Sequence, residues 1–288
     1  MKIATSPGEL EPKQRAVGIG TFDGVHLGHR RVLDAVEAAG LVSTVVTFDP
    51  HPRVALGYEV ELLTTLERRL ELLEQAGIEE TLVVEFDLDL ARLEPEEFVE
   101  AVLRPIGAEV VVAGANFRFG RSRSGDLALL GNLGFDVRAV PLVERVSSSR
   151  IRELLRAGEV GRAAGLLGRP AEVEGTVVAG DARGGTLGFP TANLRPDPLL
   201  LVPAFGIYAG AAEEGRAAIS IGTNPHYGGE ERRIEAFLLD FEGDLYGRRL
   251  VLQLWRRLRD ERAFDSEEAL VAQIAKDVEE TRAAEPPV

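Results

Sequence analysis

The fold of the first half of the chain is decided at residues 17–40, which read VGIGTFDGVHLGHRRVLDAVEAAG. Residues 17–21 form an apolar run of the kind found in buried strands, and residues 30–39 repeat apolar side chains at the spacing of one helix face. Glycines and two histidines stand between these two segments. The stretch therefore predicts a strand, a glycine-containing turn and a helix that starts beside the histidines.

The same alternation of strand and helix patterns continues through residue 167. Further strands are predicted at residues 41–48, 81–86, 109–113 and 135–140, and further helices at residues 62–76, 96–103, 126–133, 150–156 and 160–167. Strands that alternate with helices are typical of a parallel sheet covered by helices on both faces. We therefore expect an α/β domain with a Rossmann-like parallel sheet at residues 1–168.

The pattern changes after residue 170, where apolar runs follow one another without helices between them. These runs lie at residues 173–178, 206–211, 217–221, 234–240 and 250–258. Short strands separated by turn residues predict an antiparallel barrel or sandwich at residues 169–288. One amphipathic helix, capped by Asp265 or Ser266, is expected to close this domain, and the tail at residues 283–288 is expected to fray.

The overall composition limits the kinds of partner. The 288 residues include 47 acidic and 33 basic side chains, for a net charge of −14, which argues against nonspecific binding to nucleic acid. No run approaches the ~20 apolar residues of a membrane helix, and the start has no apolar stretch like that of a signal peptide. The chain has no cysteine, which excludes disulfides and thiolate chemistry. A cytoplasmic location is therefore expected.

The junction at residues 20–29 carries the first candidate chemistry. Gly24 and Gly28 permit close approach to the backbone, and a helix N-terminus offers free N–H groups to an anion. His26 and His29 lie on one turn and could donate hydrogen bonds to phosphate oxygens. An ordinary helix start with two surface histidines is the alternative, and a zinc site is a weaker one because no third ligand stands nearby.

Two later segments carry groups suited to nucleotides or flat rings. Residues 146–152 read VSSSRIR, in which the serines either cap a helix or, with the flanking arginines, hold a triphosphate. Residues 114–126 read GANFRFGRSRSGD and carry three arginines within six residues. Their Phe-Arg-Phe core suits a flat ring or a base, and a solvated loop is the alternative.

The second half contains a glycine-rich segment at residues 180–193, which reads GDARGGTLGFPTAN. It lacks the spacing of a Walker loop. Glycines together with Arg183 can still surround a polyphosphate, and Thr191 and Asn193 offer oxygen atoms to Mg²⁺. An ordinary turn followed by a strand is the alternative.

Glu235 is an acidic residue within an otherwise apolar predicted strand, where alternation places it on one face with Phe237 and Leu239. A carboxylate in such surroundings is either paired with a cation or functional. It could act as a general base toward a hydroxyl group, or it could pair with Arg232 or Arg233.

Eight motifs resemble a known family. GTFDGVHLGH, TFDPHPR, GANFRFGRSRSGD and SSSRIR resemble, in order and spacing, the FMN adenylyltransferase module of bacterial bifunctional FAD synthetases, which belongs to the H-x-G-H nucleotidyltransferase superfamily. LGFPTANL, GIYAG, ISIGTNPHYGG and IEAFLLDFEGDLYG resemble the riboflavin kinase domain, a six-stranded barrel. The resemblance covers nearly the whole chain. It implies phosphorylation of riboflavin to FMN by ATP, followed by adenylylation of FMN to FAD.

The resemblance also implies site residues. The catalytic residues would be His26, His29 and Glu235, and the metal ligands Thr191 and Asn193. The ATP and its phosphates would contact Gly20, Phe22, Asp23, Gly24, Gly28, Ser148, Arg152, Gly180 and Arg183. The flavin would contact Asp49, Pro50, Pro52, Asn116 and Arg118. Mg²⁺ would be the metal, the partners would be riboflavin, FMN, FAD and ATP without nucleic acid or membrane, and the chain would be a monomer or a weak homo-oligomer.

Several positions depart from the usual family pattern. Ala179 and Phe237 stand where the family often has histidine, Gly185 stands where it often has arginine, and residues 134–145 are fewer than usual. The three departures in the second half keep open a flavin-binding or regulatory protein in which one site has decayed. The wider superfamily also includes nucleotidyltransferases that act on pantetheine or nicotinate compounds, but such enzymes have no need of a barrel.

Overall fold

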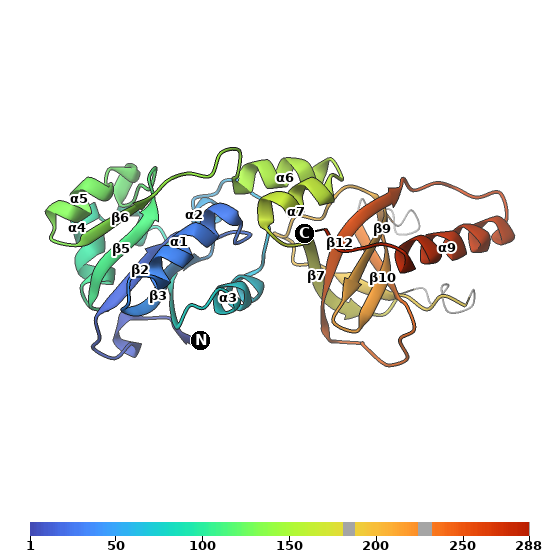
Figure 1. Cartoon of the computed structure of the whole chain (residues 1–288), viewed down its shortest axis with the longest axis horizontal. Coiled ribbons are helices and arrows are strands. Elements are labelled where there is room, and N and C mark those ends of the chain that lie inside the picture. The colour runs from blue at the N-terminus through green and yellow to red at the C-terminus, as the bar shows by residue number, and fades with distance from the viewer. Residues whose placement is uncertain (181–187, 224–231, 288) are drawn as a thin grey trace. The chain divides into compact units, whose positions relative to one another are not determined.

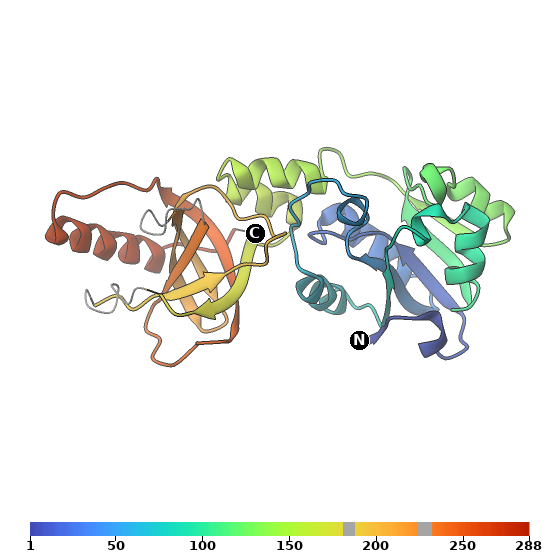
Figure 2. The ribbon, with the colours of Figure 1, turned by 180° about the vertical axis from the view of Figure 1, so that it is seen from behind.

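The computed structural model describes residues 1–180, 188–223 and 232–287 (Figure 1). The chain divides into two compact units, Met1–Ser148 and Ser149–Val288. The first contains a sheet with its helices, and the second contains a barrel. Figure 2 shows the same ribbon from behind. Arg183 and Gly185, which the sequence analysis singled out, lie outside the described residues.

The first unit is built on a parallel sheet with the strand order β1-β4-β3-β2-β5-β6. Its strands are β1 (Lys2–Ala4), β2 (Arg15–Ile19), β3 (Val42–Asp49), β4 (Glu80–Glu85), β5 (Ala108–Gly114) and β6 (Asp136–Val140). All five strand pairs are parallel, which confirms the expected α/β domain. All five residues of β2 are buried, because helices cover both faces of the sheet.

Helices cover the two faces of this sheet in separate groups. The helices are α1 (Leu27–Glu37), α2 (Pro52–Ala55), α3 (Leu66–Gln75), α4 (Pro95–Phe98) and α5 (Leu127–Asn132), with short turns at Pro7–Glu9, Leu90–Arg92, Val99–Leu103 and Arg121–Arg123. Side chains of α1 and α3 pack with Val45 and Val110 in one core. Side chains of α4 and α5 pack with Val46 and Val111 in a second core. Alternate residues of each strand therefore serve opposite cores.

Two helix boundaries differ from the sequence-based prediction. The helix predicted at residues 62–76 begins at Leu66, because the hydroxyl of Thr65 accepts the N–H of Arg68 and caps the helix there. The helix predicted at residues 96–103 is a short α-helix followed by a π-helical turn. Strand β1 was not predicted, because a strand of three residues carries almost no periodic signal.

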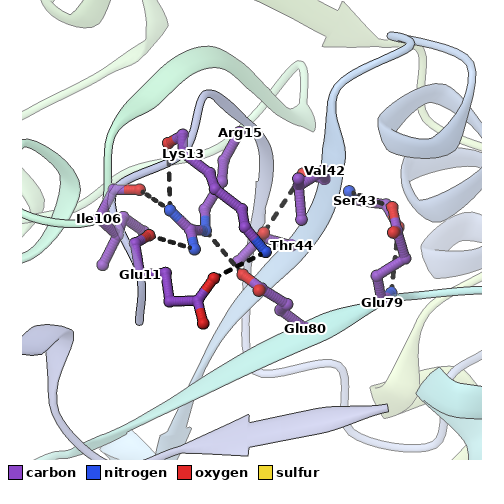
Figure 3. Close-up of polar contacts among 9 residues, drawn as sticks. All are labelled: Glu11, Lys13, Arg15, Val42, Ser43, Thr44, Glu79, Glu80 and Ile106. Atoms are coloured by element: carbon purple, nitrogen blue, oxygen red, sulfur yellow. Dashed lines mark hydrogen bonds and ion pairs between the residues drawn. The ribbon is translucent and has the colours of Figure 1, made fainter. Parts of the chain in front are cut away.

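A buried ion pair holds the amino ends of the strands together (Figure 3). Arg15 has no exposed surface, and its Nε donates to Glu80 Oε2 at 2.7 Å. Its other nitrogens donate to the carbonyl oxygens of Ile106 at 2.6 Å, Glu11 at 2.8 Å and Lys13 at 3.1 Å. A buried cation is tolerated when acceptors surround it in this way. Arg15 thus ties β2 to β4 and to the segment before β5.

The second unit is a closed barrel with the strand order β10-β11-β8-β7-β12-β9. Its strands are β7 (Ala171–Val178), β8 (Ala192–Arg195), β9 (Gly206–Ala212), β10 (Gly215–Thr223), β11 (Arg232–Leu238) and β12 (Arg249–Arg259). Neighbouring strands pair antiparallel, and closure leaves no free sheet edge. The barrel prediction is confirmed. Strand β8, with four residues, is the strand that the apolar runs did not reveal.

Among the described residues of the second half, the helices are α6 (Ser148–Arg156), α7 (Val160–Leu167) and α9 (Glu267–Arg282). Helix α7 packs against β7 and β12. The division into compact units falls near the start of α6, whereas the sequence pattern predicts a domain boundary after α7.

The C-terminal helix α9 (Glu267–Arg282) is fastened to the barrel through its C-terminal half. Ser266 rather than Asp265 caps it, by accepting the N–H of Ala269 at 3.2 Å. Asp277 is buried and accepts hydrogen bonds from Arg259, the nearest at 2.7 Å. The tail was expected to fray, but Ala284 packs beside Trp255 and is buried, so the order extends to that residue.

Candidate active sites

The strand order of the first unit indicates where its parallel sheet can bind a ligand. From β2 the chain proceeds to β3 and β4 on one side, and β5 and β6 lie on the other side. The carboxyl ends of β2 and β5 therefore form the point at which the winding reverses, where open parallel sheets bind ligands. Residues 20–29, called the histidine loop below, follow β2, and residues 115–126 follow β5. The tertiary structure thus brings two of the predicted segments to one edge.

The two histidines form a stacked pair at the start of α1. Nδ1 of His26 accepts the backbone N–H of His29 at 3.2 Å, so His26 is the N-cap of the helix. The two rings lie 3.7 Å apart with an angle of 10° between their planes. Because Nδ1 accepts a hydrogen bond, a neutral His26 carries its proton on Nε2. This geometry presents an N–H donor beside the amides and positive dipole of a helix N-terminus.

The histidine loop has a constrained backbone. Gly24 has φ +82°, and a Cβ atom at this position would lie 2.7 Å from Leu63 Cδ1. Phe22 and Val25 also have positive φ values, 48° and 35°, although neither is glycine. Such conformations cost energy and persist where the surrounding structure holds them, and both side chains are almost completely buried. The loop is therefore held in one shape by its own apolar residues.

The carboxylate of Asp23 clamps the histidine loop to the segment before α3. Its Oδ1 accepts the N–H of Leu63 at 2.8 Å and that of Thr64 at 3.2 Å, and the N–H of Gly24 donates to Thr64 Oγ1 at 3.2 Å. The hydroxyl of Ser148 donates to the carbonyl oxygen of Asp23 at 3.0 Å. The structure therefore joins two residues predicted to contact ATP, Asp23 and Ser148, in one hydrogen-bond network.

The turn after β3, residues 49–52, lies at the same edge because β3 is the neighbour of β2. We call it the proline turn. Asp49 ends the strand, and its peptide bond to Pro50 is cis. Nδ1 of His51 accepts the N–H of Arg53 at 3.1 Å, and Pro52 opens α2. The predicted flavin residues of this turn thus begin a capped helix beside the histidine loop.

Two arginines of the segment after β5 pair with carboxylates, one within the segment and one before α4. Arg118 is exposed and lies 2.6 Å from Asp126, the N-cap of α5, and Arg121 lies 2.7 Å from Glu94. Asn116 is exposed, as a residue that contacts a ligand would be. The Phe-Arg-Phe core is split between two environments, because Phe119 belongs to the hydrophobic core and Phe117 is partly exposed.

Arg152 lies on α6 and is 7% exposed. It falls in the second compact unit, whereas the histidine loop falls in the first. Gly180 follows β7 in the barrel unit.

The second candidate site lies on the barrel wall, where three adjacent strands align polar residues. Glu235 of β11 pairs in register with Asn193 of β8 and with Ser220 of β10. Residues directly opposite one another in antiparallel strands share a face. The adjacent Ile234 and Ala236 are fully buried in the barrel interior, so Glu235 points from the outer wall. Asn193 therefore lies beside it on that wall.

Glu235 contacts both a cation and a hydroxyl group. Its Oε1 lies 3.1 Å from Nε of Arg233, and its Oε2 accepts the hydroxyl of Thr191 at 3.4 Å. The predicted pairing with Arg233 is present, and the carboxylate also lies beside a proposed metal ligand. Phe237 packs edge-on against Phe189 with 5.3 Å between ring centres. Leu239, predicted on the same face, comes directly after the strand, which ends at Leu238.

The oxygen atoms at this site fit a magnesium ion. Asn193 is 9% exposed, and its Oδ1 is buried without a hydrogen-bond partner among residues 1–180, 188–223 and 232–287. An unsatisfied buried oxygen is costly unless something else binds it. Amide, hydroxyl and carboxylate oxygens are the ligands that Mg²⁺ takes in proteins.

Sequence reasoning missed Glu261, which follows β12. A Cβ atom on Gly222 would lie 2.7 Å from Glu261 Oε2, so the carboxylate rests on β10. Burial raises the pKa of the Glu261 carboxyl, Arg259 opposes this shift and the negative charge of Glu235 adds to it. The Glu261 carboxylate is therefore close enough to Glu235 for the two charges to interact. Its sequence neighbours are charged and give no signal of this placement.

The comparisons with known proteins match each half of the chain to a family model. The family model described as FAD synthetase matches residues 9–152, and the model described as riboflavin kinase matches residues 167–284. A solved structure described as a macrolide-efflux protein of Streptococcus pneumoniae has a TM-score of 0.86 and 33% identity, over 97% of this chain and 98% of that chain. That description concerns the pneumococcal protein. Within the described part of this chain, no helix has the length and apolarity to cross a membrane.

Curated relatives share both halves of the chain. A protein of Listeria monocytogenes is 37% identical over 93% of this chain and 92% of its own length, and one of Bacillus subtilis is 35% identical over 96% and 95%. One of Escherichia coli is 36% identical over 90% of this chain and 89% of its own length. All three are named bifunctional riboflavin kinase/FMN adenylyltransferase.

An α/β unit with a histidine pair at its switch point, followed by a barrel with a carboxylate and an amide on its wall, defines a two-centre phosphate-transfer protein. The chain belongs to the family of bifunctional riboflavin kinase/FMN adenylyltransferases. The family expected from the motifs is confirmed.

Proposed function

We propose that this chain makes FAD in two ATP-dependent steps, one in each half. In the first step the ribityl hydroxyl of riboflavin attacks the γ-phosphorus of ATP and forms FMN and ADP. In the second step a phosphate oxygen of FMN attacks the α-phosphorus of another ATP, and pyrophosphate leaves. The observation that carries the proposal is that each compact unit holds its own polar cluster, the histidine pair in one and the Glu235 group in the other.

The adenylyl transfer is assigned to the histidine loop. Nε2–H of His26 and the ring of His29 donate to phosphate oxygens and stabilise the charge that develops at the α-phosphorus. The catalytic contribution is positioning and charge stabilisation, with no covalent intermediate. The residues proposed to hold the nucleotide are Gly20, Phe22, Asp23, Gly24, Gly28, Ser148 and Arg152. Asp23 is buried, and its carboxylate accepts hydrogen bonds from the N–H groups of Leu63 and Thr64. Both observations support a role for Asp23 in shaping the loop.

The flavin for this step is assigned to the proline turn and to the segment after β5. The residues proposed to contact it are Asp49, Pro50, Pro52, Asn116 and Arg118. Both segments follow strands adjacent to β2, so their position at the same sheet edge supports this assignment. The Arg118–Asp126 pair is exposed, and an exposed pair is weak enough to yield to a phosphate.

The phosphorylation of riboflavin is assigned to the barrel wall. Glu235 accepts the proton of the attacking hydroxyl, and Arg233 orients the carboxylate through the contact of 3.1 Å. Thr191 and Asn193 would hold Mg²⁺, which neutralises charge on the ATP phosphates when bound. Gly180 and Arg183 are proposed to contact the same ATP, and the second of these lies outside the described residues.

We assign the adenylyltransferase domain to residues 1–168 and the kinase domain to residues 169–288. We also propose a cytoplasmic monomer or weak homo-oligomer that uses Mg²⁺ and has no nucleic-acid or membrane partner. Sedimentation of the purified chain over a range of concentrations would test the oligomeric state.

One product assay tests the two-site assignment. Purified chain with riboflavin, ATP and Mg²⁺ should yield FMN and FAD, which chromatography separates. His29→Ala should stop FAD formation and leave FMN formation intact, and Glu235→Gln should stop FMN formation while FAD still forms from added FMN. If each substitution abolished both products equally, the assignment would be wrong.

The same assay decides the alternative of a regulatory protein with one decayed site. A chain that binds flavin, with one module consuming no ATP, would support that alternative. The presence of His26, His29, Thr191, Asn193 and Glu235 favours two working sites.

A further inference from the structure

Arg69 occupies a position that normally holds an apolar residue. It lies on the inner face of α3 with Leu72 and Leu73, at the spacing that turns side chains toward the core. Only 2% of its surface is exposed. A cation in such a place requires acceptors around it.

The acceptors of Arg69 belong to two segments of the proposed adenylyl-transfer site. Its Nη1 lies 2.9 Å from the carbonyl oxygen of Thr21, in the histidine loop, and 3.0 Å from the carbonyl oxygen of Phe48, next to the proline turn. The hydroxyl of Thr47 lies 3.2 Å from the same nitrogen. One guanidinium therefore connects the carboxyl ends of β2 and β3.

The burial of Arg69 is incompletely compensated. Its Nε is buried and has no hydrogen-bond partner within the described ranges. Its ion pair with Asp49 is long, at 3.7 Å, and that carboxylate is 45% exposed. Burial lowers the pKa of Arg69, while the charges of Asp23 and Asp49 oppose the shift. Since an apolar side chain of similar volume would avoid these penalties, stability alone does not account for a cation here.

Arg15 provides a matched comparison within the same sheet. It is equally buried, but it forms a 2.7 Å ion pair with Glu80 and donates to three carbonyl oxygens (Figure 3). Its partners lie at the amino ends of the strands, away from the candidate site. Arg15 thus braces the sheet without touching the histidine loop or the proline turn.

We propose that Arg69 is a positioning residue for adenylyl transfer, which sets the spacing between the histidine loop and the proline turn. This inference rests on the proposed function, because those segments are assigned to the nucleotide and to the flavin. The alignment of the attacking phosphate with the α-phosphorus depends on that spacing. Since a displacement of about 1 Å can lower a rate about 100-fold, loss of the bridge should reduce kcat more than it changes either KM.

The test compares Arg69→Met, Arg69→Lys and Arg15→Met in the full-length chain. For each we would measure FAD formation from FMN and MgATP as kcat and KM, riboflavin phosphorylation, and thermal unfolding by circular dichroism. Arg69→Met should lower kcat for FAD formation roughly 10- to 100-fold. Arg69→Lys should recover part of this loss, because an ammonium group can donate to one of the two carbonyl oxygens. Riboflavin phosphorylation should remain at the wild-type rate in all three variants.

Arg15→Met separates positioning from stability. It should lower the unfolding temperature at least as much as Arg69→Met and leave kcat of the folded protein unchanged. Equal losses of kcat in the two methionine variants, or a wild-type kcat in Arg69→Met, would overturn the inference. If Arg69→Met does not fold, a wild-type kcat in Arg69→Lys would overturn it instead. A wild-type chain that forms no FAD from FMN would overturn the proposed function together with this inference.

Discussion

The side-chain amide of Asn193 rests against the Cα of Gly180, so closely that a Cβ atom at residue 180 would lie 2.6 Å from Oδ1. Gly180→Ala should therefore displace the proposed magnesium ligand without adding or removing any polar group. Because about 1 Å of displacement can cost 100-fold in rate, we expect FMN formation to fall roughly 10- to 100-fold. The rate at several Mg²⁺ concentrations would be measured, and excess metal should restore part of it.

Gly165→Ala is the matched control for that substitution. Gly165 lies within α7, and a Cβ atom there meets nothing within 4 Å. An alanine inside a helix should stabilise the chain by about 0.5–1 kcal/mol and leave both activities unchanged. A wild-type rate of FMN formation in Gly180→Ala would show that the position of Asn193 does not matter for this step.

Two substitutions of His26 separate its capping role from its proposed role at phosphate. Asparagine retains an acceptor for the N–H of His29, whereas alanine does not. Both should lower FAD formation about 10²- to 10³-fold, because both remove the imidazole donor. Only alanine should also destabilise the protein, by about 1 kcal/mol. Steady-state kinetics and urea unfolding would be compared, and a fully active His26→Asn would contradict the assignment.

Gly24→Ala tests whether the shape of the histidine loop matters. A residue with φ +82° is strained when it is not glycine, and here the new Cβ would also press on Leu63. Gly40→Ala is the control, since Gly40 has φ +73° but open space around its Cβ position. Each should cost about 1–2 kcal/mol of stability. Only Gly24→Ala should also reduce FAD formation, and equal activity in the two variants would exclude the loop-shape effect.

Glu261→Gln should change how the stability of the barrel depends on pH. An acid whose pKa is raised on folding destabilises the folded state as pH rises above its unfolded value, here 4.5. The glutamine variant should therefore match the wild type well below pH 4.5 and be slightly more stable at neutral pH. Unfolding followed through Trp255, the single tryptophan, reports on the barrel. A variant that is less stable than the wild type at neutral pH would contradict the prediction.

Several features of this protein could be predicted because they depend on residues close together in the chain. The alternation of strands and helices, the change to a barrel after residue 170 and the helix start at the histidines all follow from local periodicity and capping. Glu235 stood out for the same reason, as an acidic residue in an apolar strand. The motifs around these residues also predicted the family.

Tertiary structure alone decided how these parts meet. The strand order that places the histidine loop beside the proline turn depends on pairing between distant strands, which no local pattern encodes. The Asp23 clamp spans 40 residues, and the contact of Thr191 with Glu235 spans 44. Arg69 is a charged residue that the sequence motifs did not single out, and the packing of α3 on the sheet buries it. Long-range packing sets such contacts, because burial and hydrogen bonding reward groups that the chain brings together only on folding.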